Sequence, residues 1–328
     1  MASTLSGERS AADEQADASG AGSAVRPRRI TFGWLGLAPF FGYVLLIFLV
    51  PIGFILYDAF RKTVTSAAPV RDPVTQQFVH TTSSSFTGSN LSQSLQGVYR
   101  TSLITSVKLS AIVAVIGAVI GVLLASAVVN STSRVLRQIV TSAAAVTANF
   151  GGIPLAFLFI ATLDANSGVL TTFLQNHFHF SIQDDAHLHL DQLSGLSLVY
   201  LYFLIPLMVL VMTPALEGLK PQWGEAAENL GASRWNYWRL VAGPVLLPNF
   251  LGSLLLLFCS SFSAFATAYA VNSSFPLVTI RIKAVLSGNV LPGQENLGAA
   301  LALDMIIIVL PLTIIYQLLQ RRTSKWLA

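Results

Sequence analysis

Six long apolar stretches recur along the chain, and they constrain its fold more than any other feature. Each has about 20 or more mostly apolar residues, the length that an α-helix needs to cross the hydrocarbon core of a bilayer. Only 10% of the 328 residues are charged, whereas a soluble domain carries about 25%. We therefore predict an all-α integral membrane protein with about six transmembrane helices, at roughly 34–57, 103–129, 139–163, 196–216, 248–271 and 297–319.

The segment before the first apolar stretch has a different character. Residues 1–29 are rich in Ala, Ser, Gly and acidic side chains, so they cannot bury a core and are expected to form a disordered cytoplasmic N-terminus. The transmembrane domain then covers residues 30–328. Arg28 and Arg29 would suit a twin-arginine export signal, but the apolar stretch after them is too long and no small-residue cleavage site follows it. We favour a retained helix with a basic flank.

Lys and Arg residues set the expected orientation, because they are enriched in cytoplasmic loops. They occur in 130–138, in 217–247 and near both ends of the chain, whereas the 164–195 loop has neither. Both termini are therefore predicted in the cytoplasm, with the 58–102, 164–195 and 272–296 loops on the opposite side.

Smaller features of the apolar stretches bear on packing and partners. Gly117 and Gly121 form a GxxxG pair, which lets another helix approach closely. Cys259 is the only cysteine, so an intrachain disulfide and a thiolate metal cluster are excluded. The basic residues are scattered, with no basic helix or aromatic-basic motif, which indicates that nucleic acid is not a partner.

The 217–247 loop combines several helix start and stop signals. Pro221 suits the first turn of a helix. An apolar and partly small face follows at helical spacing, made by Trp223, Ala226, Ala227 and Leu230. Gly231 suits the helix end, since glycine readily adopts a left-handed conformation, and Ser233 can cap the next helix. The pattern predicts two short helices with a break between them.

This loop resembles the EAA loop of binding-protein-dependent ABC importer permeases of the type I fold. The resemblance rests on Glu225-Ala226-Ala227, Gly231-Ala232, Val241, Pro244 and Pro248. Gly243 departs from the family pattern, which usually has leucine before the proline. The wider resemblance extends from roughly residue 34 to 320, and it implies the type I permease architecture for the whole membrane domain.

In that family the loop docks into a cleft on a cytoplasmic ATPase subunit. The resemblance therefore implies ATPase-coupling roles for Glu225, Ala226, Ala227, Glu228, Gly231 and Ala232. The chain has no GxxxxGK[ST] nucleotide motif, so it is expected to be neither an enzyme nor a cofactor-binding protein. ATP and Mg²⁺ would be bound by the partner ATPase. An amphipathic helix at the membrane interface without a partner is the alternative.

The resemblance also implies the remaining partners and the location. These are a cytoplasmic ABC ATPase dimer, a second permease subunit that is homologous or identical, and an extracytoplasmic solute-binding protein, assembled in the bilayer of the bacterial inner membrane. Residues 204–210, 215–217 and 225–232 look more like the spermidine/putrescine branch than the sugar branch, and relatives of the former also move ferric iron, thiamine or phosphonates. We therefore expect a polyamine-like or another small solute, delivered by the binding protein.

Polar residues in the fifth apolar stretch indicate a solute path. At about 100° per residue, one side of a single helix would carry Asn249, Ser253, Ser260, Ser263 and Thr267. We expect Ser260, Ser263 and Thr267 to line the path. The alternative is helix packing, with the hydroxyl groups bonded to carbonyls of the preceding turn.

Two further features each have two interpretations. Asp304 lies in the last apolar stretch, and an intramembrane carboxylate indicates a functional role, unless it sits near the outer end of the helix in water. The 164–195 loop carries His177, His179, His187 and His189. Two strands would bring these imidazoles onto one face as a zinc site. We favour a polar hairpin that contacts the binding protein, with no metal.

An ion-coupled secondary transporter is the main rival function. Such a protein would usually show an internal repeat and several midplane ionisable residues, but only Asp304 and Lys108 are candidates. A membrane-embedded enzyme would need catalytic side chains inside the spans, and the five His residues lie outside them.

Overall fold

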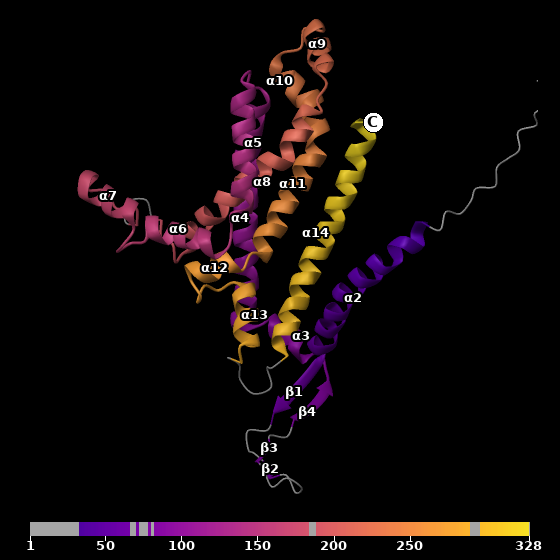
Figure 1. The fold of residues 1–328 in the computed structure, drawn as a ribbon, viewed down its shortest axis with the longest axis vertical. Helices are drawn as coiled ribbons and strands as arrows, with labels where there is room; N and C mark the ends of the chain where they lie inside the picture. Colours follow the sequence, from indigo (N-terminus) through magenta and orange to yellow (C-terminus); the bar gives the residue numbers. More distant parts are fainter. Residues whose placement is uncertain are drawn as a thin grey trace, which may run out of the picture. The chain divides into compact units, whose positions relative to one another are not determined.

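A computed structural model describes residues 33–65, 70–71, 78–79, 82–183, 188–288 and 296–327 (Figure 1). The predicted disordered segment 1–29 lies outside the described residues. The chain divides into two compact units, residues 1–52 and 53–328. The boundary falls within α2 (Gly33–Ala59), an apolar helix with Pro39 and Pro51 inside it.

After the end of α2, the second unit contains two short hairpins that the sequence did not predict. β1 (Arg61–Thr65) pairs antiparallel with β4 (Thr82–Phe86), and β2 (Val70–Arg71) pairs with β3 (Phe78–Val79). α3 (Ser89–Ser94) follows and packs against the last long helix. The Asn90 side-chain amide donates to the Arg61 carbonyl at 2.8 Å, and the Asn296 amide donates to the same oxygen. These bonds attach the base of the hairpin to the helices.

The long helices pack around α4 (Gly97–Val129). α4 contacts α8 (Leu193–Glu217) and α11 (Gly243–Ser263), and α11 also contacts α14 (Leu297–Leu327). The buried core where they meet includes Leu109, Val113, Tyr200, Leu204, Met208 and Leu257. Gly121 of the predicted GxxxG pair lies against Met208, so α8 is the helix that approaches closely.

The number of membrane-spanning helices agrees with the sequence. Among the described residues, five helical runs are long and apolar enough to cross a membrane, and a bent pair makes a sixth if it counts as one span. The five runs are Leu37–Ala59, Gly97–Val129, Leu193–Glu217, Arg234–Ser263 and Leu297–Leu319. The expected all-α membrane fold with about six spans is confirmed, with the small hairpins added to it.

The segment expected as one transmembrane helix over 139–163 is broken into two helices. α5 (Arg134–Asn149) and α6 (Ile153–Leu163) meet at an angle of 101°. Gly152 has φ +79°, a conformation that favours glycine, and Pro154 lies in the first turn of α6. After α6, the Ser167 hydroxyl and the N–H groups of Asn166 and Ser167 donate to the Asp164 carboxylate and lower its pKa. α7 (Val169–Phe178) then begins.

The expected single helix over 248–271 is also interrupted. α11 ends at Ser263, and α12 (Ala266–Val271) begins after a two-residue break, followed by α13 (Val278–Leu286). The two breaks lie together, because the Gly152 N–H donates to the Thr267 hydroxyl at 2.8 Å. The Tyr200 hydroxyl of α8 donates to the Ala264 carbonyl at 3.1 Å. Groups freed by each break are thus satisfied by neighbouring helices, as membrane proteins require.

Candidate functional site

The 217–247 loop folds as two short helices with a break, as its sequence predicted. α9 (Pro221–Asn229) begins at Pro221, and Gly231 after its end has φ +73°. The Gly231 N–H donates to the Glu228 carbonyl and the Ala232 N–H to the Ala227 carbonyl, both at 2.9 Å. These two bonds form a Schellman motif, which satisfies the last carbonyls of a helix. The break therefore has a defined geometry.

The second helix of the loop contains an irregularity that the sequence did not predict. Ser233 caps α10 (Arg234–Tyr237), since its hydroxyl accepts from the Asn236 N–H at 3.3 Å. A π-helical turn, η1 (Trp238–Ala242), then leads into α11, and the Gly243 N–H donates to the Trp238 carbonyl. A Cβ at position 243 would lie 2.6 Å from that carbonyl oxygen. The π-turn therefore explains why glycine replaces the usual leucine before Pro244.

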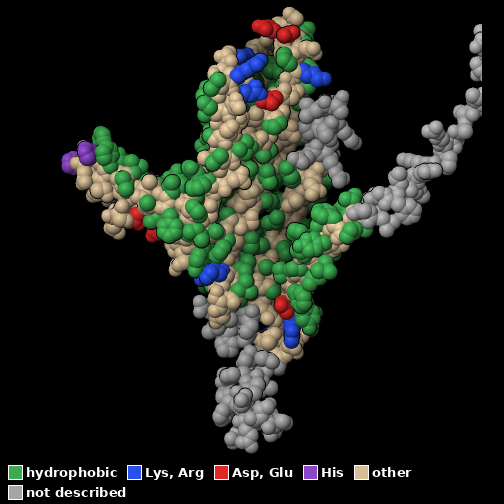
Figure 2. Space-filling view, viewed as in Figure 1, with side chains coloured by type: hydrophobic (Ala, Val, Ile, Leu, Met, Phe, Trp, Pro, Cys, Tyr) green, Lys and Arg blue, Asp and Glu red, His purple; other side chains and the backbone are tan. Residues whose placement is uncertain are grey.

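The loop exposes large apolar side chains. None of the α9 residues is buried. Leu230 is 87% exposed, Trp235 71% and Leu240 70%. Figure 2 shows acidic side chains at the tip that α9 forms, and Glu225 and Glu228 are the acidic residues of that helix. The surface thus combines carboxylates with apolar groups that water solvates poorly.

A groove runs between α9 and the helices that follow it, and we call it the α9 groove. Its volume is about 460 Å³. It is lined by Trp223, Ala226, Ala227, Leu230, Ala232, Asn236, Tyr237, Leu240, Val241 and Val245. Three of the six predicted coupling residues, Ala226, Ala227 and Ala232, line it. Their small side chains leave the space that a partner side chain would need.

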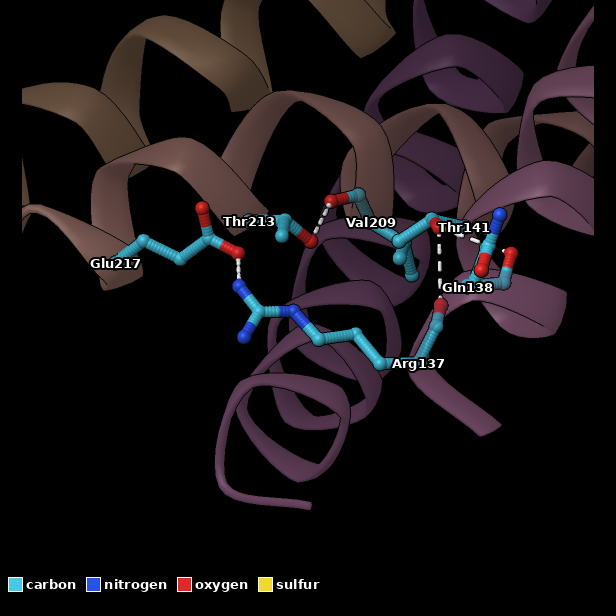
Figure 3. A network of polar contacts seen from close by, with 6 residues as sticks. All are labelled: Arg137, Gln138, Thr141, Val209, Thr213 and Glu217. Carbon is cyan, nitrogen blue, oxygen red and sulfur yellow. Dashed lines mark hydrogen bonds and ion pairs between the residues drawn. The ribbon is translucent and has the colours of Figure 1, made fainter. Parts of the chain in front are cut away.

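The structure brings the predicted cytoplasmic segments to one end of the helices. A second hollow of about 830 Å³ is lined by Ser126 and Asn130 at the end of α4 and by Glu228 and Arg234 of the loop. Arg137 at the start of α5 forms an ion pair with Glu217 at the end of α8 (Figure 3). The C-terminal end of α14 lies toward the same end in Figure 1. Which side of the membrane this end faces remains a prediction.

The predicted path residues do not form one stripe. Thr267 lies beyond the end of α11, is 3% exposed and binds Gly152. Ser253 is buried, and its hydroxyl donates to the Asn249 carbonyl at 2.8 Å. Ser260 is half-buried, and Ser263 is exposed at the end of α11. The Ser263 hydroxyl donates to the Cys259 carbonyl at 2.8 Å, as the packing alternative expects. A path role for Ser260 and Ser263 stays a prediction.

Asp304 and the histidine loop have local structural partners. Asp304 is 7% exposed on α14 and lies near Ser94 of α3, so the alternative in which it lies in water is wrong. The His177 ring stacks on Phe173 with 4.5 Å between ring centroids, and His179 ends α7 with φ 49°. His187 lies outside the described residues. Among those residues no group of three or more His, Cys, Asp or Glu side chains is placed to hold a metal.

A family model described as the binding-protein-dependent transport system inner membrane component matches residues 117–325. The chain belongs to this family. The matched region begins within α4 and includes α9, the α9 groove and both broken spans. Membership of this inner membrane family agrees with the membrane-spanning helices.

Several members of the permease family resemble part of the chain. It is 24% identical to the ferric transport system permease protein FbpB of Actinobacillus pleuropneumoniae over 46% of this chain and 22% of that protein. It is 33% identical to the molybdenum transport system permease protein ModB of Escherichia coli K12 over 38% of this chain and 51% of that protein. It is 28% identical to the spermidine/putrescine transport system permease protein PotC of Haemophilus influenzae over 40% and 49%. The matches thus span from about a fifth to half of these relatives.

The fold also resembles a solved structure. A chain of a bacterial ABC transporter involved in the import of the acidic polysaccharide alginate superposes with a TM-score of 0.60 over 89% of this chain and 96% of that chain. The two are 16% identical, so the likeness concerns the fold alone. This fold is the permease architecture that the sequence predicted.

Proposed function

We propose that this chain is the transmembrane permease subunit of an ATP-binding-cassette importer. In this role its helices form the solute path, and the loop around α9 couples them to a separate cytoplasmic ATPase. The observation that carries the proposal is the α9 groove beside an exposed helix with a fixed stop at Gly231. Membership of the binding-protein-dependent transport family supports the same function.

Energetics of the exposed side chains favour a protein partner at this surface. Burying one large apolar side chain stabilises by about 1.5–3 kcal/mol. Leu230 and Trp235 lie on either side of the break between the two helices, and both side chains are largely exposed. A cleft that covers both would gain about 3–6 kcal/mol from them alone. Glu225 and Glu228 beside them would pair with basic groups of the same partner.

The proposed assembly contains a cytoplasmic ABC ATPase dimer, a second permease subunit and an extracytoplasmic solute-binding protein in the bacterial inner membrane. ATP and Mg²⁺ belong to the ATPase, and this chain is not itself an enzyme. Both termini lie in the cytoplasm in this arrangement, since the basic 130–138 and 217–247 segments share one end of the helices. A membrane-facing role for α9 without a partner is the alternative for this surface.

The solute is a small molecule or ion that the binding protein delivers. A polyamine is our finer proposal, based on the likeness of 204–210, 215–217 and 225–232 to the spermidine/putrescine branch. Ferric and molybdenum permeases resemble the chain as well. Uptake of radiolabelled spermidine, with and without a hundredfold excess of unlabelled molybdate, compares the two chemistries directly.

Co-purification and ATP hydrolysis test the proposed function. The chain, purified from its own host membranes in mild detergent, is expected to bring an ABC ATPase that hydrolyses ATP. Changing both Leu230 and Trp235 to aspartate should weaken this association by about a hundredfold or more, since about 3 kcal/mol or more of apolar burial is lost. Leu286→Asp is the matched control, because Leu286 is 74% exposed on α13 and lies outside the proposed ATPase surface.

The same experiment separates the rival function. An ion-coupled secondary transporter would purify without an ATPase, and a protonophore would stop its uptake while ATP remains available. Buried Asp304 is the observation that favours this rival function. An unmodified chain that yields no ATPase, or a double variant that keeps it, would contradict the ABC permease proposal.

Cysteine labelling tests the solute path. In a Cys259→Ala background, cysteine at position 260 or 263 is expected to react with small charged thiol reagents, because Ser260 is half-buried and Ser263 is exposed. Cysteine at 262 or 267 should not react, since Phe262 is 2% and Thr267 is 3% exposed. The measurement is the labelling rate in sealed vesicles. Equal labelling rates at all four positions would contradict a solute path along the side of α11 that carries Ser260 and Ser263.

A further inference from the structure

Arg137 and Glu217 come from segments 80 residues apart and form an ion pair at the loop end of the helices (Figure 3). Arg137 lies in the first turn of α5, and Glu217 is the last residue of α8. Their side chains are 37% and 40% exposed. Glu217 stands four residues before Pro221, where α9 begins. The pair therefore connects α5 to the base of the 217–247 loop, which we call the coupling loop.

Each charge is at the unfavourable end of its own helix. A helix has a partial positive charge at its N-terminus, where Arg137 lies, and a partial negative charge at its C-terminus, where Glu217 lies. Because α5 and α8 pack together, each side chain instead reaches the favourable end of the other helix. The position of both charges is thus explained by the contact between the helices, and not by the stability of either helix alone.

α5 is a continuous helix, and the backbone just beyond its C-terminal end is held by a hydrogen bond to another helix. The Thr141 hydroxyl donates to the Arg137 carbonyl at 2.9 Å within the first turns. α5 has 16 residues in all and ends at Asn149, which makes it about 24 Å long. Beyond it, Gly152 binds Thr267 of α12, just after the break that ends α11 at Ser263. One helix therefore links the base of the coupling loop to the junction of the two broken spans.

We propose that the Arg137–Glu217 pair is a positioning contact that makes α5 follow the coupling loop, so that ATP-driven movement of the loop reaches the junction of the broken spans. This inference rests on the proposed importer function. A half-exposed ion pair contributes only about 0–1 kcal/mol to stability. Loss of the pair should therefore leave the fold and the bound ATPase intact and should affect the transmission of movement.

A reporter at the junction measures that transmission. A side chain at Gly151 would meet no atom within 4 Å, so Gly151→Cys in a Cys259→Ala background gives a probe where α5 meets α6. The complex with its ATPase is labelled with a charged methanethiosulfonate reagent, with and without ATP plus vanadate. We expect nucleotide to change the labelling rate in the otherwise unmodified chain.

Charge reversal tests the pair itself. Arg137→Glu and Glu217→Arg should each reduce the nucleotide-dependent change by about fivefold or more, the usual lower bound for coupling between sites. The double reversal should restore it, because the exchanged charges form the same pair and then match the dipole of their own helices. Arg134→Glu is the matched control, since Arg134 lies one turn away on α5 and is exposed.

The possible results separate the pair from the importer function. If single reversals respond to nucleotide as the unmodified complex does, or if the double reversal restores nothing, the positioning role is wrong while the importer function stands. If the unmodified complex holds an ATPase but position 151 does not respond, the link through α5 is wrong. If no ATPase accompanies the unmodified chain, the importer function fails and this inference fails with it.

Discussion

Replacing Gly121 with leucine is expected to abolish the accumulation of folded protein. Gly121 lies where α4 crosses α8, and even a Cβ there would be 3.0 Å from the Ile205 carbonyl oxygen and would overlap the Met208 side chain. Overpacking a core with extra methylenes typically costs about 1–3 kcal/mol, and occasionally more. Here the obstruction includes backbone at the centre of the core. The measurement is the yield of monodisperse protein from detergent extracts.

Substitutions at two further glycines serve as controls for Gly121→Leu. A Cβ at Gly117 would meet the Leu257 side chain at 3.3 Å, which is tight but movable, so Gly117→Ala should reduce the yield only slightly. A side chain at Gly42 of α2 would meet nothing within 4 Å, so Gly42→Leu should leave the yield unchanged. If Gly121→Leu accumulated as well as Gly42→Leu, the close crossing of α4 and α8 would be wrong.

The GxxxG pair illustrates what the sequence could predict about packing. Small residues four apart indicated that some helix approaches closely. The sequence could not name the helix, because Met208 lies 87 positions further along the chain. Hydropathy is a local property, so it located the spans well. Contacts between spans depend on residues far apart in sequence, and no local pattern records them.

The two broken spans differ in how visible they were. Gly151, Gly152 and Pro154 are signals of a break, yet we predicted a continuous span because membrane helices tolerate such residues. The break after Ser263 has no Gly or Pro at Ala264 or Phe265. It coincides with hydrogen bonds from Tyr200 and to Thr267, both remote in sequence. Its position could be found only from the three-dimensional arrangement.

The 217–247 loop was the best-predicted part of the candidate site, because helix caps and stops are local. Pro221 lies in the first turn of α9, and Gly231 and Ser233 act through hydrogen bonds between residues within five positions of each other. The π-turn before Gly243 was missed, although the departure from leucine at that position was its signal. The Arg137–Glu217 pair was missed for a different reason, since the two residues lie 80 positions apart and no local pattern relates them.

Replacing Gly231 with valine is expected to abolish uptake without loss of folded protein. Gly231 has φ +73° in the Schellman motif that separates α9 from α10. A left-handed conformation costs a residue with a side chain about 1–2 kcal/mol, and valine adopts it poorly. The motif should open and change the angle between the two helices. Uptake and ATPase association should then fall together, whereas the yield of folded protein is unchanged because Gly231 is exposed and no residue of α9 is buried.

Asparagine at the same position distinguishes two explanations: backbone strain at position 231, and obstruction of the partner contact by a side chain. Asparagine tolerates the left-handed conformation, and a side chain at Gly231 would meet no atom of this chain within 4 Å. Gly231→Asn should therefore keep both uptake and ATPase association if the angle between α9 and α10 is what matters. If valine and asparagine are equally inactive, the partner requires the absence of a side chain, and Gly231 lies in the contact itself. If valine imports solute at the unmodified rate, the loop does not couple ATP hydrolysis to transport.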